Sequence, residues 1–556
     1  MNAYPFADLS WILKRGLERG GDLLSAGEAV VVQQILSLDS AEGFVFARLT
    51  ARKRAVFHIE TLKNAWDDES VNAIARLKQK GLVCGFVPAK LRYPEMSVKR
   101  LKFLCKQHGL ATTGRKRHLI AQLSDTPVVH ETGWFRMLHA RLVFRLTQWA
   151  FLSAKSRADN PLLERMGVIR WVQYECTPGQ ILFERRAHLL AWETVHRGLR
   201  QETLSVGECV DYLERGPHTG SLSLRGWVCR SLMSTARNLE RKGALADAGK
   251  VYRLLWEKWT DGPRAMCAIR MGRVLERSGS VLESYQWLSA VRKELSDQDR
   301  RELLPLGRRL GRATGLGWAP ERPLITASQR TLCLPLAGKT NVRPMYTVGD
   351  TVAHVDESVS ACIRNAGRTV IRGESGFLGT VYGLFFSSLY FLPVTGALPV
   401  PFMPGPIDVG RPGFAGPRQP HAMRLLQRIR DGAGEELVSD TWRRFYGAQL
   451  YGVRWELAPL HDWVQLTSSL PPETLFFLAR YLLEGGRRRF AGFPDWVILP
   501  GDKVKVPDAF PRVLSPSVSF VEVKGPKDSL SGRQKYWNHL LVQWGCQAEI
   551  WKVSGQ

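Results

Sequence analysis

Two apolar segments near the C-terminus each carry an acidic residue, and they constrain the fold more than any other feature of the chain. Asp495 directly precedes the apolar run Trp496 to Leu499, and the later segment Phe520 to Lys524 reads Phe-Val-Glu-Val-Lys. Side chains alternate between the two faces of a strand. Glu522 and Lys524 are therefore predicted on one face, with the two valines packed on the other. The pattern indicates a sheet that holds an acid and a base side by side.

These residue types suit a metal-dependent phosphodiesterase. Mg²⁺ and Mn²⁺ prefer oxygen ligands, which Asp495, Glu522 and the backbone carbonyl of Val523 can supply. Lys524 is a compact cation that can orient or help deprotonate an attacking water. One or two ions would then clamp the scissile phosphate. The alternative is structural, because Val-Glu-Val-Lys also fits an amphipathic edge strand with a solvated face.

The residues after this motif form a complete supersecondary unit. A polar turn over residues 527–529 is followed by a helix that carries Gln534 and has one apolar face, and then by a strand from Ala548 to Val553. This unit resembles the virus-type replication-repair nuclease domain, a branch of the PD-(D/E)xK superfamily. The resemblance implies an α/β fold and places Gln534 in the catalytic site.

An upstream segment extends the resemblance. The residues Arg372-Gly373-Glu374-Ser375, followed by the apolar run Val381 to Phe386, look like the segment of the Fanconi-associated nuclease family in which a glutamate supplies another metal ligand. The resemblance therefore implies that Glu374 binds metal. The chain departs from the family at Ser387-Ser388, where the family has Trp-Asp.

Two Pro-Asp dipeptides compete for the second strand carboxylate. The family spaces its two strand carboxylates more closely than Asp495 and Glu522, which are separated by an extra loop from Gly501 to Ser517. Asp508, in that loop, is nearer to the usual distance. We prefer Asp495 because an apolar run follows it, whereas Ala-Phe-Pro-Arg follows Asp508 and makes a poor central strand.

Length, charge and cysteine content agree with an enzyme that acts on nucleic acid. The 556 residues exceed what one core usually supports, and 78 Lys plus Arg against 52 Asp plus Glu give a formal charge of +26 that favours polyanionic partners. No apolar run reaches the roughly 20 residues of a membrane span. The N-terminus lacks the features of a signal peptide. Nine scattered cysteines without a Cys-x-x-Cys pair favour a reducing compartment, which is the cytoplasm, with the nucleoid if bacterial, or the nucleus if eukaryotic.

A basic segment near residue 100 predicts a DNA-binding unit. Ser97 can cap a first helix that Gly109 ends, and Gly114 precedes a second helix, each helix with a leucine-containing apolar face. This arrangement resembles the SAP motif, which grips duplex DNA, although a solvated basic surface is the alternative. The cations that would contact DNA are Lys99, Arg100, Lys102, Lys106, Arg115, Lys116 and Arg117.

The chain is predicted to be multidomain, with a mainly α-helical N-terminal two-thirds and a C-terminal α/β PD-(D/E)xK nuclease domain. The expected regions are 1–95, helical; 96–150, SAP-type with a following helix; 151–344, helical; and 345–556, nuclease. Within the third region, the pattern Leu-x-x-x-Gly occurs twice, at Leu239 to Gly243 and at Leu275 to Gly279. This weak repeat resembles tetratricopeptide-like hairpins, which serve as a scaffold or bind a protein partner.

These regions in this order resemble a bacterial-type Fanconi-associated nuclease over nearly the whole chain. The resemblance implies a structure-specific DNA nuclease that cuts branched or flapped DNA near 5′ flaps, degrades 5′ to 3′ and serves interstrand crosslink repair. Eukaryotic members carry an additional N-terminal zinc finger that this sequence lacks. A junction-resolving or restriction-like nuclease and a non-catalytic DNA-binding scaffold are the alternatives.

Enzymes that measure from a 5′ end need a cationic pocket for the terminal phosphate, and arginine forks suit phosphate. Two groups of residues are candidates: Arg487, Arg488 and Arg489 before the Gly-Phe-Pro-Asp turn, and Arg533 beside Gln534. The alternative is that the first three only flank a helix C-terminus, where cations are favoured.

Overall fold

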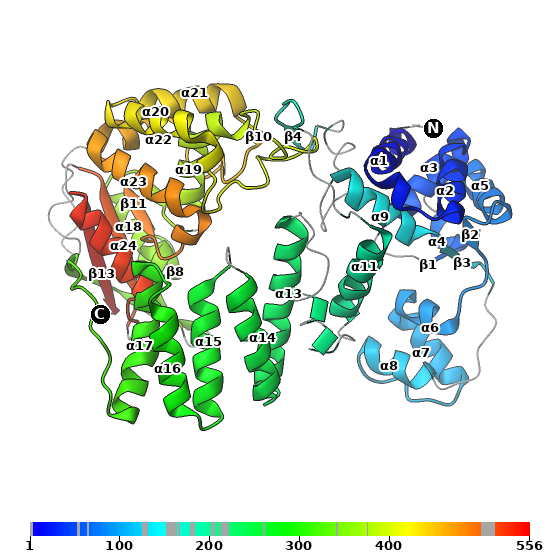
Figure 1. The fold of residues 1–556 in the computed structure, drawn as a ribbon, viewed down its shortest axis with the longest axis horizontal. Helices are drawn as coiled ribbons and strands as arrows, with labels where there is room; N and C mark the ends of the chain where they lie inside the picture. Colours follow the sequence, from blue (N-terminus) through cyan, green and yellow to red (C-terminus); the bar gives the residue numbers. More distant parts are fainter. Residues whose placement is uncertain are drawn as a thin grey trace. The chain divides into compact units, whose positions relative to one another are not determined.

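The computed structural model describes most of the chain, in two compact units. The described residues are 4–52, 56–63, 66–124, 132–151, 164, 167–177, 183, 185–201, 205, 207–208, 211–212, 222–259, 262–340, 343–374, 376–501, 517–526 and 528–555. Unit 1 comprises Met1–Ile169, Gln180–Leu190 and Thr219–Ser221, and unit 2 comprises Arg170–Gly179, Ala191–His218 and Leu222–Gln556. Figure 1 shows the elements of both units along the chain.

Unit 1 is mainly helical. Its helices are α1 (Tyr4–Gly20), η1 (Gly21–Leu23), α2 (Ala26–Leu36), α3 (Ser40–Thr50), α4 (Ile59–Lys63), α5 (Asp68–Gln79), α6 (Ala89–Arg92), η2 (Tyr93–Glu95), α7 (Val98–Gln107), α8 (Lys116–Ser124) and α9 (Ala140–Phe151), and α11 (Arg186–Gln201) runs from unit 1 into unit 2. Three short strands, β1 (Val56–His58), β2 (Val83–Cys84) and β3 (Trp134–Met137), pair in the order β1-β3-β2. Two of these strands interrupt the helices that we expected over residues 1–95.

The SAP-like helices form where the sequence predicts them. Ser97 caps α7 by accepting a hydrogen bond from the backbone N–H of Arg100, and Gly109 follows the helix with a φ of +65°. A small core joins α7 and α8 to the residues before them; it contains Tyr93, Met96, Leu101, Leu104, Cys105, Leu119 and Leu123. The apolar side chains thus face inward, which leaves the basic side chains outside.

Unit 2 contains a run of antiparallel helices: α13 (Leu222–Arg241), α14 (Leu245–Lys258), α15 (Arg264–Arg277), α16 (Val281–Arg292) and α17 (Asp297–Thr314). The turns between α13 and α14 and between α15 and α16 contain Gly243 and Gly279, with φ values of +83° and +87°. Only glycine adopts this conformation at little cost. The two hairpins therefore share a turn geometry, which explains why the Leu-x-x-x-Gly pattern is repeated in the sequence.

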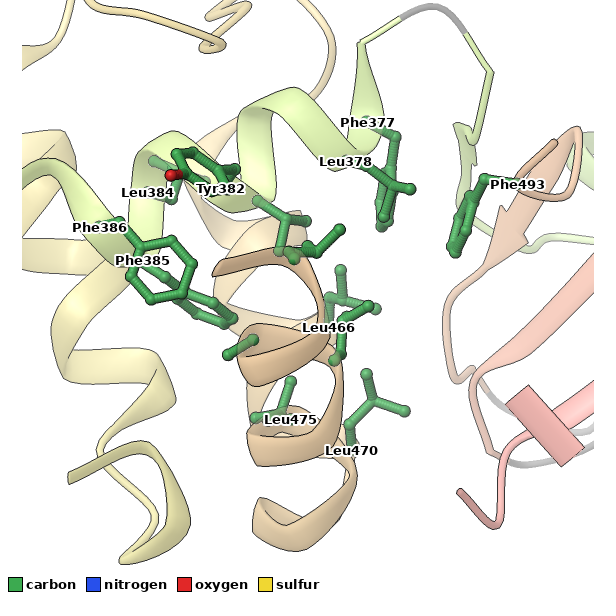
Figure 2. Packing of buried hydrophobic residues seen from close by; sticks show 14 of the residues in the cluster. Phe377, Leu378, Tyr382, Leu384, Phe385, Phe386, Leu466, Leu470, Leu475 and Phe493 are labelled. Atoms are coloured by element: carbon green, nitrogen blue, oxygen red, sulfur yellow. The ribbon is translucent and has the colours of Figure 1, made fainter. Parts of the chain in front are cut away.

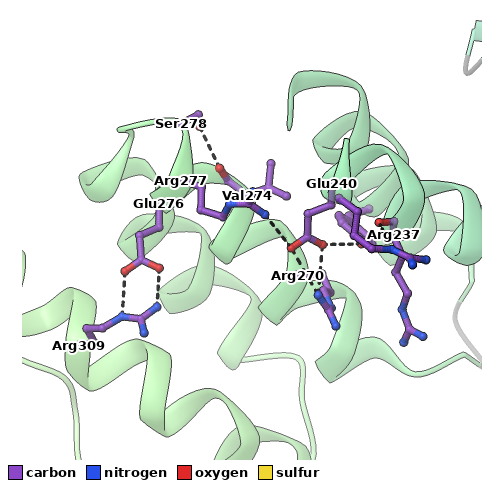
Figure 3. Close-up of polar contacts among 10 residues, drawn as sticks. Arg237, Glu240, Arg270, Val274, Glu276, Arg277, Ser278 and Arg309 are labelled. Carbon is purple, nitrogen blue, oxygen red and sulfur yellow. Dashed lines mark hydrogen bonds and ion pairs between the residues drawn. The ribbon is translucent and has the colours of Figure 1, made fainter. Parts of the chain in front are cut away.

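Ion pairs of the buried Glu240 and of the partly exposed Glu276 join these helices (Figure 3). Glu240 on α13 accepts hydrogen bonds from Tyr252 of α14 and from Arg270 and Arg277 of α15 at 3.0 to 3.4 Å. Glu276 of α15 pairs with Arg309 of α17. Because each carboxylate connects neighbouring helices, the pairs fix the order in which the helices stack.

The remainder of unit 2 is built on a mixed five-stranded sheet. Its strands are β5 (Ser328–Leu334), β9 (Val370–Arg372), β11 (Trp496–Ile498), β12 (Ser519–Lys524) and β13 (Gln547–Gly555), in the order β5-β13-β12-β11-β9. The strands β12 and β13 are parallel, as are β13 and β5, whereas β11 runs antiparallel to both of its neighbours. The sheet uses β5, which lies before residue 345, so it extends beyond the predicted start of the C-terminal region.

Two smaller sheets and nine helical elements complete this part of the described chain. The strands are β4 (Arg170–Trp171) with β10 (Ala448–Gln449), and β6 (Leu336–Thr340), β7 (Arg343–Val348) and β8 (Thr351–His354). The helices are α18 (Val355–Asn365), α19 (Phe377–Tyr390), η3 (Gly416–Arg418), α20 (Gln419–Arg430), α21 (Gly434–Phe445), α22 (Leu460–Ser469), α23 (Pro472–Gly485), η4 (Gly486–Arg489) and α24 (Gly532–Gln543).

The strands β11 and β12 bury both faces. Val497 and Phe520 belong to a large core with α19 and α24, whereas Trp496, Val521 and Val523 pack on the opposite face with α18. This is the alternation predicted for a strand that carries Glu522 and Lys524. Both residues therefore face the side of the sheet covered by α24.

The apolar helix α19 lies at the centre of the large core (Figure 2). The ring of Phe377 stacks on that of Phe493 at 5.2 Å, which ties the start of α19 to the segment before β11. Ser387, where the family pattern has tryptophan, is buried and its hydroxyl lies 2.7 Å from that of Thr441 on α21.

Within the described ranges, no single helix is long and apolar enough to cross a membrane. The helices α2 and α3 reach such a length only together, and they are bent by 119°. The described cysteines are all free.

Candidate active site

Three neighbouring strands bring the predicted acidic residues together. In the antiparallel register of β11 and β12, Trp496 pairs with Val521, so Asp495 lies opposite Glu522. The Asp495 carboxylate accepts a hydrogen bond of 2.7 Å from the backbone N–H of Val523. The backbone N–H of Gly373, which follows β9, donates to the carbonyl of Asp495 at 2.7 Å. Glu374, two residues after the end of β9, therefore lies beside Asp495.

Gly373 is required by this close approach. A Cβ atom added there would lie 2.0 Å from the carbonyl oxygen of Pro494, which is shorter than any allowed contact. The Arg-Gly-Glu sequence thus lets the end of β9 reach the turn before β11. Glu374 itself is exposed to solvent.

Glu522 is the most enclosed of the acidic side chains. It is fully buried, and one of its oxygens accepts a hydrogen bond from Gln534 at 2.5 Å and contacts the ammonium group of Lys524 at 2.7 Å. The other oxygen, Oε2, is buried without a hydrogen-bond partner. A buried carboxylate oxygen that lacks a partner is costly unless a cation or a donor completes it.

Gln534 is held by the start of α24. Ser531 caps this helix, accepting a hydrogen bond from the backbone N–H of Gln534, while the Gln534 side-chain oxygen accepts one from the backbone N–H of Ser531. This capping box fixes the side chain, so its amide N–H points at Glu522. The local sequence Ser-Gly-Arg-Gln therefore orients a residue of the site.

Crowding perturbs the protonation of both buried carboxylates. Burial, with the charges of Glu374 and Asp356, raises the pKa of Asp495 to about 6, although the hydrogen bond from Val523 opposes this. Burial and the charge of Asp495 raise the pKa of Glu522 to about 8, although Lys524 opposes this. Burial lowers the pKa of Lys524, but Glu522 and Asp495 raise it more. The site therefore favours the addition of positive charge.

The described side chains do not form a closed metal cage: among them, no three of His, Cys, Asp or Glu lie close enough together to hold an ion. The carboxylates of Asp495 and Glu522 instead bond to the protein, and Glu374 extends into solvent. Asp356 on α18 acts on Asp495 and was not predicted, because nothing in its local sequence relates it to the strands. Asp508 and Ser375 lie outside the described residues.

The arginines predicted to bind a 5′ phosphate lie near one another but contact other protein groups. Gly492, three residues after η4, packs against Arg533 at the start of α24. This contact brings the chain that follows η4 close to α24. Arg533 forms an ion pair with Glu302 of α17. Arg489 donates to the carbonyl of Tyr481 at 2.6 Å. Burial raises the pKa of the Tyr451 hydroxyl, and the charge of nearby Arg487 opposes this. Arg488 lies between them on η4.

The predicted DNA-binding cations lie in unit 1. Six of the seven are exposed: Lys99, Arg100, Lys102, Lys106, Arg115 and Arg117. Lys116 is half-buried and donates to the carbonyl of Pro94 at 2.7 Å, which ties α8 to the segment before α7. It therefore has a structural contact as well as a charge.

Comparisons with known proteins agree with this architecture. Residues 429–555 match the VRR-NUC domain model. The chain is 22% identical over 98% of its length to a Fanconi-associated nuclease 1 homolog of Arabidopsis thaliana, and 24% identical over 96% of its length to one of Pseudomonas aeruginosa. It spans 66% of the Arabidopsis protein, 18% of an Oryza sativa homolog and 91% of the Pseudomonas protein.

The fold is also that of a solved structure. The chain superposes on a crystal structure of paFAN1 bound to a 2-nucleotide 5′-flap DNA with a gap, with a TM-score of 0.81 and 22% sequence identity. The similarity covers 100% of this chain and 98% of that chain. The predicted fold class, a mainly helical N-terminal part followed by an α/β nuclease-type domain, is confirmed.

Proposed function

We propose that the chain is a member of the Fanconi-associated nuclease family, which it resembles over nearly its whole length. We propose that it is a structure-specific DNA nuclease that hydrolyses phosphodiester bonds in branched or flapped DNA. Its proposed activities are 5′-flap cleavage and 5′-to-3′ degradation in DNA repair, with interstrand crosslink repair as the role. The observation that carries this proposal is the convergence of Asp495, Glu522, Lys524 and Gln534 at one face of the sheet.

We propose that Asp495, Glu522, the carbonyl of Val523 and Glu374 hold one or two divalent cations, Mg²⁺ or Mn²⁺. The partnerless buried oxygen of Glu522 supports this, because a hard cation would supply its missing contact. The raised pKa values of Asp495 and Glu522 support it too, since a cation would favour their charged forms. A bound divalent cation supplies charge stabilisation to the phosphate and lowers the pKa of water.

The protein's own groups position the reaction. Gln534 binds one oxygen of Glu522 and leaves the other oxygen, Oε2, without a protein partner. Lys524, paired with Glu522 and 13% exposed at its side chain, can donate hydrogen bonds to a water or a phosphate oxygen. These two residues orient the carboxylate and the water.

Regions outside the site would bind the substrate. The exposed cations of α7 and α8 suit contacts with duplex phosphates, which add affinity without sequence preference. The helices α13 to α17 serve as a scaffold or as a surface for a protein partner. We retain the predicted order of four regions as the proposed functional divisions, but the fourth region begins at β5 rather than at residue 345, because β5 belongs to its sheet.

We also propose that Arg487, Arg488, Arg489 and Arg533 form a pocket for a 5′ phosphate. The packing of Gly492 on Arg533 supports it, because it brings the two arginine-bearing segments together. The phosphate would have to compete with Glu302 for Arg533.

Cleavage assays test the proposed function. Single-stranded, duplex, 5′-flap, 3′-flap and four-way substrates would be incubated with the protein, with and without Mg²⁺ or Mn²⁺. We expect metal-dependent cutting near 5′ flaps, and loss of cutting with retained DNA affinity for Glu522→Ala and Lys524→Ala, because contacts outside the site supply most of the binding. Lys535→Ala is the matched control, since Lys535 is exposed on α24 next to Gln534.

Three results would contradict the proposal. Near-normal cutting by Glu522→Ala or Lys524→Ala would show that the site is elsewhere. A preference for four-way junctions would favour a junction-resolving nuclease. Binding without cleavage in every condition would favour a non-catalytic scaffold.

A further inference from the structure

A second cationic site lies at the turn between α16 and α17, apart from the acidic residues of the proposed metal site. A pocket of about 480 Å³ opens there. Its basic lining residues are Arg292, Lys293, Arg300, Arg301 and Arg322. Its acidic lining residues are Asp297 and Glu321. Five positive against two negative charges leave a surplus of three in a concave site.

The two acidic residues neutralise only part of the pocket. Glu321 pairs with Arg292 at 2.6 Å and with Arg300 at 3.5 Å, and Asp297 also pairs with Arg300. No carboxylate of the described residues forms an ion pair with Lys293, Arg301 or Arg322. These three cations therefore supply the surplus charge.

Arg301 is the buried cation of the pocket lining. It is 9% exposed, donates one hydrogen bond of 2.9 Å to the carbonyl of Arg322, and lies over the ring of Tyr536 at 5.6 Å. Its Nε is buried without a hydrogen-bond partner. Glu321 offsets part of this charge without forming an ion pair with Arg301, and the same carboxylate already pairs with Arg292 and Arg300. A buried charged donor gains from a further partner, so the pocket can accept an anion.

We propose that this pocket binds a phosphate group. Arginine forks bind phosphate oxygens through parallel hydrogen bonds, and the unused Nε of Arg301 can provide one of them. The volume admits a group of nucleotide size. Because Tyr536 lies on α24, which also carries Gln534, the same helix connects the pocket to the candidate active site.

The phosphate can belong to a DNA strand or to a free phosphate compound, and two binding measurements separate these sources. The first records the thermal stability of the metal-free full chain with increasing inorganic pyrophosphate. The second records the affinity for a short single-stranded oligothymidylate as a function of salt, again without metal. Neither measurement requires cleavage, so the result does not depend on the proposed nuclease activity.

The test variant is Lys293→Glu combined with Arg322→Glu, because both side chains are exposed and the substitutions should leave the fold intact. Arg308→Glu combined with Arg312→Glu is the matched control: both residues are exposed on α17, lie outside the pocket and change the net charge equally. Arg301→Gln is a second test, which removes the buried charge alone.

We expect the test variant to weaken pyrophosphate binding about tenfold or more, as the loss of charge-assisted hydrogen bonds implies. If the phosphate belongs to a DNA strand, the slope of log affinity against log salt should fall by about 0.7 per lost contact. The control should behave like the wild type. Unchanged binding in both measurements, or an equal loss in the control, would overturn the proposal.

Discussion

Glu522 combines properties that rarely occur together in a structural carboxylate. It is fully buried, lies beside a second carboxylate and a lysine, and leaves one oxygen without a partner. Strongly perturbed groups of this kind concentrate at functional sites. Its environment therefore distinguishes Glu522 from a glutamate on a solvated edge strand, which was the alternative at the sequence level.

The buried carboxylates should make the metal-free protein less stable as the pH rises. The pKa values of Asp495 and Glu522 rise from their ordinary values of 3.8 and 4.5 to about 6 and about 8. The folded state thus keeps protons that the unfolded state has lost, so its stability falls between about pH 4 and pH 8. In EDTA, the melting temperature of the wild type should fall over this range more than that of Glu522→Gln.

Mn²⁺ should restore the lost stability at pH 8 in the wild type, because it binds the charged carboxylates of the folded state. Parallel pH profiles for the wild type and Glu522→Gln would contradict the assigned environment of this residue.

The choice between the two aspartates has a direct test. Asp495→Asn should abolish cleavage, because Asp495 is the aspartate opposite Glu522 in the strand register. Asp508→Asn should keep near-normal activity. Single-turnover cleavage of a 5′-flap substrate measures both variants, and the reverse pattern would move the metal ligand into the loop.

At the scale of the elements, the active-site geometry depends on the packing of α24 against β12 and α17. The capping box of α24 aims Gln534 at Glu522, while Arg533, one residue earlier, turns to Glu302 of α17. Gln534 thus serves the proposed metal site, and the adjacent Arg533 serves the proposed 5′-phosphate pocket. A shift of α24 would disturb both.

The proposed 5′-phosphate pocket predicts a change in substrate preference. Arg487→Ala combined with Arg533→Ala should reduce the preference for a 5′-phosphorylated flap over a 5′-hydroxyl flap, while the remaining cutting stays metal-dependent. Glu302→Gln should increase the preference, because it removes the anion that competes for Arg533. Cleavage rates on the paired substrates measure the effect, with Lys535→Ala as control.

Equal losses on both flaps would instead assign these arginines to general backbone binding. If the wild type cuts both flaps at the same rate, the proposal of a 5′-phosphate pocket is wrong.

At the scale of the whole molecule, the net charge of +26 leaves a large electrostatic contribution to DNA binding. The exposed cations of α7, α8 and the loop between them should contribute a measurable part of this electrostatic term. Converting Lys99, Lys102, Arg115 and Arg117 to Glu should weaken duplex binding for all sequences and reduce the salt slope by about 0.9 per lost contact. Lys116 stays unchanged, because it ties α8 to the chain.

Single-turnover cleavage at saturating enzyme should change little in this variant, since the active site is intact. An unchanged salt slope would mean that the cluster is a solvated surface.

The sequence by itself determined the local features of this protein. Alternation put Glu522 and Lys524 on one face of β12, a Ser cap began α7, and repeated glycines produced two matching helical hairpins. Each depends on residues a few positions apart, through side-chain direction, capping or backbone freedom. The strand after Asp495 was predictable for the same reason.

Only the tertiary structure decided which distant residues meet. The register of β9, β11 and β12 set Glu374 and Asp495 beside Glu522, α18 added Asp356, and α17 gave Arg533 an ionic partner in Glu302. The cationic pocket likewise joins the end of α16 to residues near 320. These contacts come from strand pairing and helix packing across long loops, and no local pattern encodes them, because a side chain's neighbours in space are fixed only once the core has formed.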